Sequence, residues 1–448
     1  MLDMLFTTDA MRAVFRDTAR VQGMLDFEAA LARAEAAVAV IPSAAALSIV
    51  QCCDADAYDF AALAASARNA GNLAIPLVAA LTQRVAQLDP EARGYVHWGA
   101  TSQDAIDTGL ALQLRAALAL VARDLDRFAA ALAEKTRAHR ATVLVGRTWM
   151  QQALPVTLGL KLAEVLTAVD RHRARLAAVR PRIAVLQFGG AAGTLASLGA
   201  KGLEVEAALA SDLGLAIADA PWHTQRDNVC DVAATLGMIV ATAGKLGRDV
   251  ALLAQTEVAE AFEPAAPGRG GSSTLPHKRN PVGAAVALAA AVRVPNLVAT
   301  MLAAAVQEHE RGLGNWPAEW DTLPEICMLT AGAIDAMTGV VAGLDVDAAK
   351  MRANLDVSRG QIFAEAVQMA VAPALGRDAA HALVGALCKR AAADNRHLRD
   401  AVRDEPRLRA ILDDAALARI FDPAQYLGAT DAFIDRALAR HAAFTQES

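Results

Sequence analysis

Five long stretches of the chain contain few residues that would break a helix, and they constrain the architecture most. They cover residues 105–140, 155–186, 228–262, 280–310 and 322–341. In the third stretch Val229, Val232 and Leu236 recur at helical spacing. A helix of about 30 residues is about 45 Å long, which is too long for a compact globule. The sequence therefore predicts an all-α fold around a central bundle of long helices.

The composition supports a helical fold and disfavours nucleic acid as a partner. Hydrophobic residues make up 55% of the chain and aromatic residues only 4%, so the core is expected to consist mainly of Ala, Leu and Val. Ala and Leu are among the strongest helix formers. The formal net charge is −6, which is the wrong sign for binding nucleic acid. An anionic substrate would need a local cluster of cations.

The cysteines and the amino terminus are typical of a cytoplasmic protein. The cysteines form no C-x-x-C pair, their number is odd, and we expect no signal peptide at the start of the chain. The apolar stretch 280–307 has one charged residue, Arg293, but it contains Pro281 and Pro295. We interpret it as a helix buried in a bundle or an oligomer rather than a membrane span, and expect no membrane partner.

The interruptions between the long stretches predict three domains. Residues 1–105 hold shorter helices, residues 106–342 hold the long ones together with a polar loop at 268–281, and residues 343–448 hold shorter, more polar helices. The chain shows neither an internal repeat nor a low-complexity linker. We therefore expect three packed domains of one body.

Four polar segments that contain glycine lie at the ends of the long helices. They are HWGATSQD at 97–104, GRTWMQQALP at 146–155, GGSSTLPHKRNP at 270–281 and QEHERGLGNW at 307–316. Each has a plain structural explanation when taken alone, because Thr101 and Ser102 fit a helix cap and Arg311 fits a helix C-terminus. The third is not a P-loop, since its spacing lacks G-x-x-x-x-G-K-[ST]. Together, such segments can gather catalytic groups from distant parts of the chain.

The motifs resemble those of the fumarase/aspartase superfamily. The run from Gly271 to Asn280 resembles the superfamily's signature loop, which usually has Met at the position of Leu275. HWGATSQDAIDTG and GRTWMQQALPVTLG resemble the first and second motifs, and FGGAAGT and NLDVSRGQIFAEAV also match, so the resemblance covers nearly the whole chain. It implies a three-domain helical fold, a homotetramer whose active sites combine motifs of three subunits, and no metal or organic cofactor.

The resemblance also implies residue roles. The superfamily removes a proton next to a carboxylate and expels a leaving group from the neighbouring carbon. Ser272 is then the base, and Lys278 and Asn280 stabilise the enolate-like intermediate. A serine hydroxyl is a weak acid, so it needs a preorganised electropositive setting. The residues expected to contact the substrate are His97, Thr101, Ser102, Arg147, Trp149, Gln151, Ser273 and Arg311. For Trp149 a plain packing role fits equally well.

Two departures from the superfamily pattern indicate the leaving group. In its C–N and C–O lyases the second motif usually reads G-R-T-H, and a Glu five residues after the signature Asn orients that His. Trp149 and Ala285 stand at these positions here. A departing amine or hydroxide needs a proton, and general acid catalysis contributes about 10²–10⁴-fold. A carboxylate leaves as a stable anion and needs no such acid.

The resemblance therefore implies a lactone-forming cycloisomerase that acts on 3-carboxy-cis,cis-muconate in the breakdown of protocatechuate. A tricarboxylate suits the cations Lys278, Arg147 and Arg311, whereas Arg226 and Arg279 fit a structural or solvated role better. Two alternatives stay open: a C–N lyase similar to adenylosuccinate lyase, and an inactive scaffold that keeps the family fold. The intact signature loop disfavours the second alternative.

Overall fold

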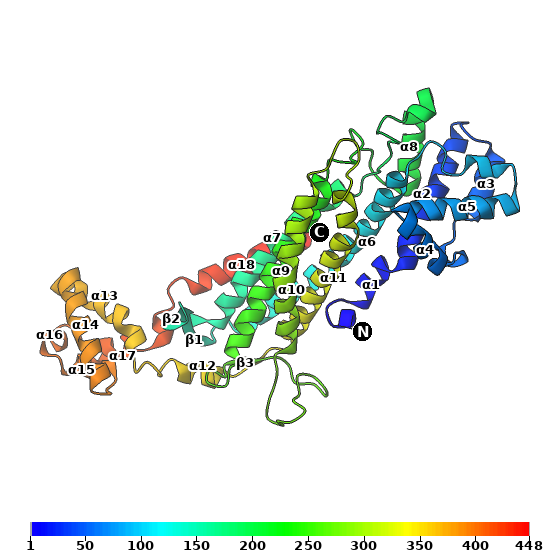
Figure 1. Cartoon of the computed structure of the whole chain (residues 1–448). Coiled ribbons are helices and arrows are strands. Elements are labelled where there is room, and N and C mark those ends of the chain that lie inside the picture. The colour runs from blue at the N-terminus through cyan, green and yellow to red at the C-terminus, as the bar shows by residue number, and fades with distance from the viewer. Residues whose placement is uncertain (1, 448) are drawn as a thin grey trace. The chain divides into compact units, whose positions relative to one another are not determined.

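The computed structural model describes residues 2–447, and nearly all of its regular structure is helical (Figure 1). The exceptions are two small antiparallel sheets. In one, β1 (Val143–Thr148) pairs with β2 (Gln151–Thr157), and in the other β3 (Ala261–Phe262) pairs with β4 (Asp345–Val346). The prediction of an all-α fold is confirmed apart from these strands.

The five predicted long helices are all present, with shifted ends. They are α6 (Ser102–Ala138), α7 (Leu158–Ile183), α9 (Asp227–Leu253), α10 (Val282–Ala304) and α11 (Asn315–Ala342). α9 ends before the predicted residue 262, because the chain turns after Leu253 and enters β3. β3 therefore precedes the polar loop. α11 begins before the predicted residue 322, since Pro317 lies in its first turn, where proline is tolerated.

Contacts divide the chain into two compact units. The first consists of the residues up to Asp126, His172–Gly244 and Val286–Asp335. Besides parts of the long helices it contains α1 (Asp9–Phe15), α2 (Asp17–Ala37), α3 (Ser43–Gln51), α4 (Phe60–Ala70), α5 (Ala74–Leu88) and α8 (Gly202–Leu213).

The core of the first unit brings α2 against α3, α6 and α8. It is rich in Ala, Leu and Val, as predicted, with Phe27 and Phe188 as its paired aromatic rings. Gly23 of α2 faces Gly109 of α6 so closely that a Cβ on Gly23 would lie 3.1 Å from the Gly109 carbonyl oxygen. The two helices can cross at this distance because neither residue has a side chain.

The second unit consists of Arg127–Arg171, Lys245–Ala285 and the chain from Ala336 onward. Its own helices are α12 (Ala348–Asn354), α13 (Ala364–Leu375), α14 (Arg377–Ala393), α15 (Leu398–Asp404), α16 (Pro406–Arg409), α17 (Asp414–Ile420) and α18 (Thr430–Glu447). A cluster of buried Val and Leu side chains joins α13, α14 and α15, and α12 packs on β1. The three-domain division follows helix length rather than contacts, and it stays a prediction.

Four helices are long and apolar enough to cross a membrane by length and composition alone: α6, α9, α10 and α11. The most apolar part is 56%, 61% and 67% buried within the protein in α6, α9 and α11, but only 28% buried in α10. Val292 and Leu302 of α10 are 68% and 56% exposed. In the single chain α10 therefore presents an uncovered apolar face.

Candidate active site

The signature loop connects β3 to α10 and is closed at its neck by backbone contacts. The Asn280 N–H donates to the Gly270 carbonyl at 2.8 Å, and its side-chain amide donates to the Gly271 carbonyl at 3.4 Å. Gly270 has φ +65°, and a Cβ there would lie 2.5 Å from the Asn280 carbonyl oxygen. Glycine at this position allows the neck to close.

Ser272 lies at the first turn beyond the neck, and its hydroxyl oxygen accepts two backbone hydrogen bonds. The N–H groups of Thr274 and Leu275 donate to Oγ at 3.3 and 3.0 Å. Such contacts are a common way for serine to close a turn. They also stabilise negative charge on the oxygen that accepts them. Ser273, the neighbouring candidate, is exposed.

The two cations of the loop differ in their contacts. The guanidinium of Arg279 is 3.1 Å from Asp345, donates to the Glu263 carbonyl at 2.9 Å and lies over the Phe262 ring. Lys278 is exposed, and none of the carboxylates whose side chains the structure describes (residues 4–445) lies at ion-pair distance from it. Arg279 therefore anchors the loop, whereas the charge of Lys278 is free to meet an anion.

Glu263 fixes both ends of the loop. Its carboxylate accepts the N–H groups of Gly283 and Ala284 at 3.0 and 2.7 Å, which caps α10, and it pairs with Arg269 at 3.2 Å. No spacing in the sequence indicated this anchor. Ala285, where the superfamily's lyases carry Glu, is exposed in the same first turn of α10.

The second motif forms a β-hairpin with a two-residue turn. Thr148 pairs with Gln151, and between them Trp149 and Met150 have φ +53° and +64°. Positive φ at both central positions is the mark of a type I′ turn, which favours Asn-Gly. Holding a non-glycine residue in this region costs about 1–3 kcal/mol. The turn projects a Trp149 side chain that is 98% exposed, with Gln151 exposed beside it.

Arg147 of the same hairpin is already paired. Its two terminal nitrogens donate to the two oxygens of buried Glu260 at 2.9 and 2.7 Å, and Asn354 donates to the same carboxylate at 2.8 Å. The pair neutralises the guanidinium and fixes β1. A direct role of Arg147 on the substrate stays a prediction, and the pair reduces the charge that Arg147 can offer.

In the first unit Asp104 organises the first motif. Its carboxylate accepts the Thr101 N–H at 3.0 Å, as in a capping box at the start of α6. It also accepts the N–H groups of Gly189 and Gly190 at 3.1 and 2.9 Å and lies 2.8 Å from Nε2 of His223. Asp104 thus connects HWGATSQD to FGGAAGT by hydrogen bonds. The cluster of polar residues in HWGATSQD was the sequence signal that could have predicted this role of Asp104.

Arg311 lies against the same pair of loops. It donates to the Gln103 side-chain oxygen at 2.9 Å and to the Ala191 carbonyl at 3.2 Å. Both acceptors are neutral, and no carboxylate in the described part of the chain lies at ion-pair distance from Arg311. Its position is fixed while its charge is uncompensated. Thr101 and Ser102 are half-buried at the nearby start of α6.

Arg226 is fully buried and holds three long helices together. From the start of α9 it pairs with Asp107 of α6 at 2.7 Å and Glu319 of α11 at 2.5 Å, and lies over the Trp222 ring. Burial acts to lower the pKa of Arg226, but the two carboxylates outweigh this effect and raise it. These contacts support a structural role rather than substrate binding.

His97 has an unusual backbone and an acidic partner. Its φ is +58°, and its Nδ1 lies 2.6 Å from Oε1 of Glu28 on α2. Glu28 was not among the candidates, although it interrupts the apolar run LDFEAAL. An acidic residue on the apolar face of a helix was the signal that could have identified it.

The candidates are divided between the units, and their assembly into one site stays a prediction. The first unit holds His97, Thr101, Ser102 and Arg311. The second holds Ser272, Ser273, Lys278, Asn280, Arg147, Trp149 and Gln151.

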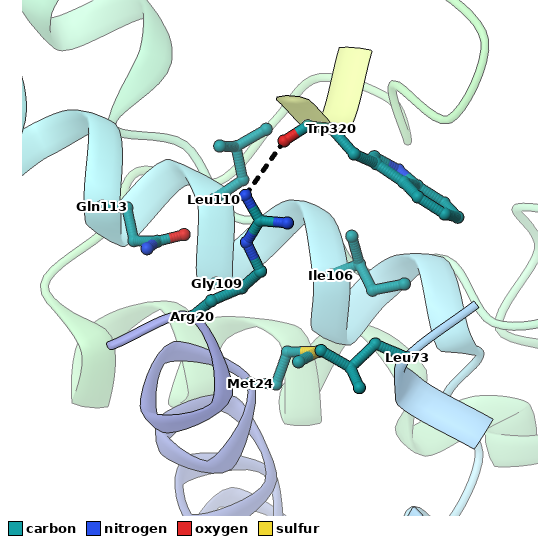
Figure 2. A pocket seen from close by; sticks show the side chains of 8 residues that line it. All are labelled: Arg20, Met24, Leu73, Ile106, Gly109, Leu110, Gln113 and Trp320. Carbon is teal, nitrogen blue, oxygen red and sulfur yellow. Dashed lines mark hydrogen bonds between the residues drawn. The ribbon is translucent and has the colours of Figure 1, made fainter. Parts of the chain in front are cut away.

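An apolar pocket in the first unit is not this site. Figure 2 shows the residues that line it: Arg20, Met24, Leu73, Ile106, Gly109, Leu110, Gln113 and Trp320. Its volume is about 60 Å³, well below the roughly 300 Å³ at which ligand sites begin. Its one cation, Arg20, donates to the Trp320 carbonyl at 3.1 Å. The pocket contains no candidate residue.

Comparisons with known proteins identify the family. The pattern of a family described as Lyase matches residues 4–296, and that of the adenylosuccinate lyase C-terminus matches residues 360–437. A Pseudomonas aeruginosa protein named 3-carboxy-cis,cis-muconate cycloisomerase is 56% identical over 441 residues, covering 98% of this chain and 96% of that protein. A Bradyrhizobium diazoefficiens protein of the same name is 52% identical over 434 residues, covering 97% and 96%.

Solved structures agree. The crystal structure of 3-carboxy-cis,cis-muconate lactonizing enzyme from Pseudomonas putida matches with a TM-score of 0.95 and 52% identity, and the match covers 99% of each chain. The resemblance read from the motifs and the predicted fold are both confirmed. The chain therefore belongs to the fumarase/aspartase lyase superfamily, in its branch of 3-carboxy-cis,cis-muconate cycloisomerases.

Proposed function

We propose that this chain converts 3-carboxy-cis,cis-muconate to 4-carboxymuconolactone. One substrate carboxylate oxygen forms a C–O bond to an alkene carbon, and the electron pair of the double bond moves to the neighbouring carbon, which lies next to another carboxylate. A proton then adds to that carbon. Substrate and product are isomers, so the proposed reaction needs no co-reactant and no cofactor.

The hydroxyl of Ser272 is the proposed proton carrier, and the observation that carries this role is its pair of backbone donors. Oγ–H protonates the carbon, and the alkoxide that remains is stabilised by the N–H groups of Thr274 and Leu275 before solvent reprotonates it. The uncompensated charge of Lys278 on the same loop favours both the alkoxide and the enolate-like intermediate. Asn280 positions the neck and offers a further amide donor.

The substrate's carboxylates are proposed to bind the cations that pair with no carboxylate in the described part of the chain. Arg311 fits this role, since its hydrogen-bond acceptors are neutral. Thr101 and Ser102 add hydroxyls at the N-terminus of α6, where the helix dipole favours an anion. Trp149 and Gln151 at the hairpin tip, with Ser273, are proposed to complete the binding site.

The missing acid supports this reaction over amine elimination. Trp149 and Ala285 carry no acidic proton, and both are exposed on separate elements. Neither residue can donate a proton to a departing amine, so amine elimination would lack its general acid. A carboxylate leaves as a stable anion and needs no proton. We therefore expect lactone chemistry without C–N lyase activity.

We also propose a cytoplasmic homotetramer in which three subunits contribute to each active site. The chain belongs to a family of soluble catabolic enzymes. The uncovered apolar face of α10 supports assembly, because soluble proteins rarely expose such a surface.

The test is an assay of the purified protein with EDTA present. We expect loss of the muconate absorbance on addition of enzyme, and no turnover of adenylosuccinate, argininosuccinate, malate or aspartate. Rapid amine release from adenylosuccinate with the muconate untouched would contradict the proposal and require an acid from another position. Turnover of neither compound by folded protein would indicate an inactive scaffold.

A further inference from the structure

A buried carboxylate on α2 contacts His97, the first residue of the HWGATSQD motif. Glu28 is 2% exposed and Glu35, two turns further along the same helix, is fully buried. Oε1 of Glu28 is 2.6 Å from Nδ1 of His97, and Oε2 has no hydrogen-bond partner among the groups that the structure describes. Burying a carboxylate is unfavourable unless a charge or hydrogen bonds compensate it. The compensating group here is the imidazole of His97.

The contact determines which edge of the ring remains available. A carboxylate can only accept, so Nδ1 carries a proton and donates to it. Nε2 makes no hydrogen bond to another described residue. The backbone of His97 is held in the left-handed region at φ +58°, which a residue with a side chain adopts at a cost. The imidazole is therefore oriented by a buried acid, with Nε2 as its free nitrogen.

The charges around the ring favour its cationic form. Burial acts to lower the pKa of His97, but Glu28 from α2, through its charge and its hydrogen bond, and Asp104 from α6 outweigh burial and raise the pKa. A cationic ring presents a donor at Nε2, whereas the neutral ring protonated at Nδ1 presents only a lone pair there. Only the cationic ring attracts a carboxylate.

We propose that Glu28 is a positioning residue that holds His97 protonated and turned so that Nε2–H donates to a carboxylate of the substrate. This inference rests on the proposed function, because it takes the ligand of His97 to be a polycarboxylate. Glu28 itself does not touch the substrate. It acts on binding through His97, while proton transfer belongs to Ser272 on a different loop.

The test variant is Glu28→Gln, which keeps a side-chain oxygen for Nδ1–H but removes the charge. The pKa of His97 should fall. In the pH range between the His97 pKa of the wild type and that of the variant, the KM for the muconate should rise about tenfold, as expected for loss of a charged hydrogen bond. As the pH is lowered through the pKa of the variant the ring regains its proton, and the KM ratio should fall towards one. Little change in kcat is expected across this range.

The matched control is Glu35→Gln. Burial, with a contribution from the charge of Glu28, raises the pKa of Glu35 to about 9. At neutral pH this side chain is an uncharged acid, so an amide of the same shape changes no charge. We expect an unaltered KM near pH 7 and pH 5.5. An equal, pH-independent KM rise in both variants would mean that α2 is disturbed and would overturn the proposal.

A double variant separates action through His97 from any direct effect. If Glu28 acts only through the ring, Glu28→Gln should raise the KM no further in a His97→Gln background. Additive effects would contradict the proposal.

NMR titration of the histidine Cε1–H signals, with His97 assigned by its loss in His97→Gln, gives a readout independent of activity. We expect the His97 pKa above its ordinary value in the wild type and lower in Glu28→Gln. A wild type that fails to lactonise while this shift is present refutes the proposed function but not the pair. A wild type that lactonises with an ordinary His97 pKa refutes the pair.

Discussion

Ser272 is half-buried on a loop, so removing its hydroxyl disturbs no packed core. Ser272→Ala deletes the proposed proton carrier and leaves the backbone N–H groups of Thr274 and Leu275 in place. We expect kcat to fall by about 10²–10⁴-fold, the usual contribution of general acid–base catalysis, with the melting temperature unchanged. The rate of muconate loss and a thermal melt measure both quantities.

The control is Thr274→Ala, which keeps the backbone donor to Oγ and removes only an exposed side chain. It should retain most of the activity. If Ser272→Ala keeps more than a tenth of the wild-type rate, the proton carrier lies elsewhere, and His97 becomes the next candidate.

At the residue scale the sequence predicted candidate groups but not their partners. Ser272, Lys278 and Arg311 were recognised from motifs, and among the described residues neither cation has a carboxylate partner. Arg147 was expected to contact the substrate and in the structure pairs with Glu260, more than a hundred residues further along the chain. Partners so distant in sequence are brought together by the fold, and no local residue spacing predicts them.

At the scale of elements, the ion-pair network around Arg226 joins α6, α9 and α11. The side chains of Arg226, Asp107 and Glu319 are fully buried, and Nε1 of Trp316 also donates to Asp107 at 3.1 Å. Arg226→Met leaves two buried carboxylates without their cation. Breaking a buried pair in this way destabilises a protein by about 3–5 kcal/mol. Urea denaturation followed by circular dichroism measures the loss.

Arg182→Met is the matched control for this network. Arg182 lies 2.8 Å from Asp231, but its side chain is 59% exposed. An exposed pair contributes about 0–1 kcal/mol, because water competes for both charges. Equal losses of stability in the two variants would show that the buried network has no special role in joining the three helices.

The helices themselves were predictable because long uninterrupted runs of Ala and Leu have few other stable arrangements. The residues at which the helices begin and end were less predictable. The β1–β2 hairpin was missed, since its turn carries Trp149 and Met150 where a type I′ turn favours Asn-Gly. A turn held against its own preference cannot be read from local sequence, and such turns occur where function selects the side chain.

For the whole molecule, α10 is the main sign of assembly. Its most apolar part is the least buried among the four long apolar helices, at 28%. Val292 near its middle is 68% exposed. Exposed apolar residues scattered singly are normal, whereas a continuous apolar helix face indicates a partner. A second copy of the same chain is the partner that the proposed shared active site requires.

Sedimentation velocity of the purified protein at micromolar concentration should therefore give a homotetramer. Val292→Glu places a charge on the face of α10 and should dissociate the assembly, with loss of activity, because an unpaired buried charge is strongly unfavourable. Leu47→Glu is the control: Leu47 of α3 is 72% exposed but lies outside the long helices, so the tetramer and the activity should persist. A fully active monomer would refute both the assembly and the shared site, and dissociation by Leu47→Glu alone would move the interface from α10 to the N-terminal helices.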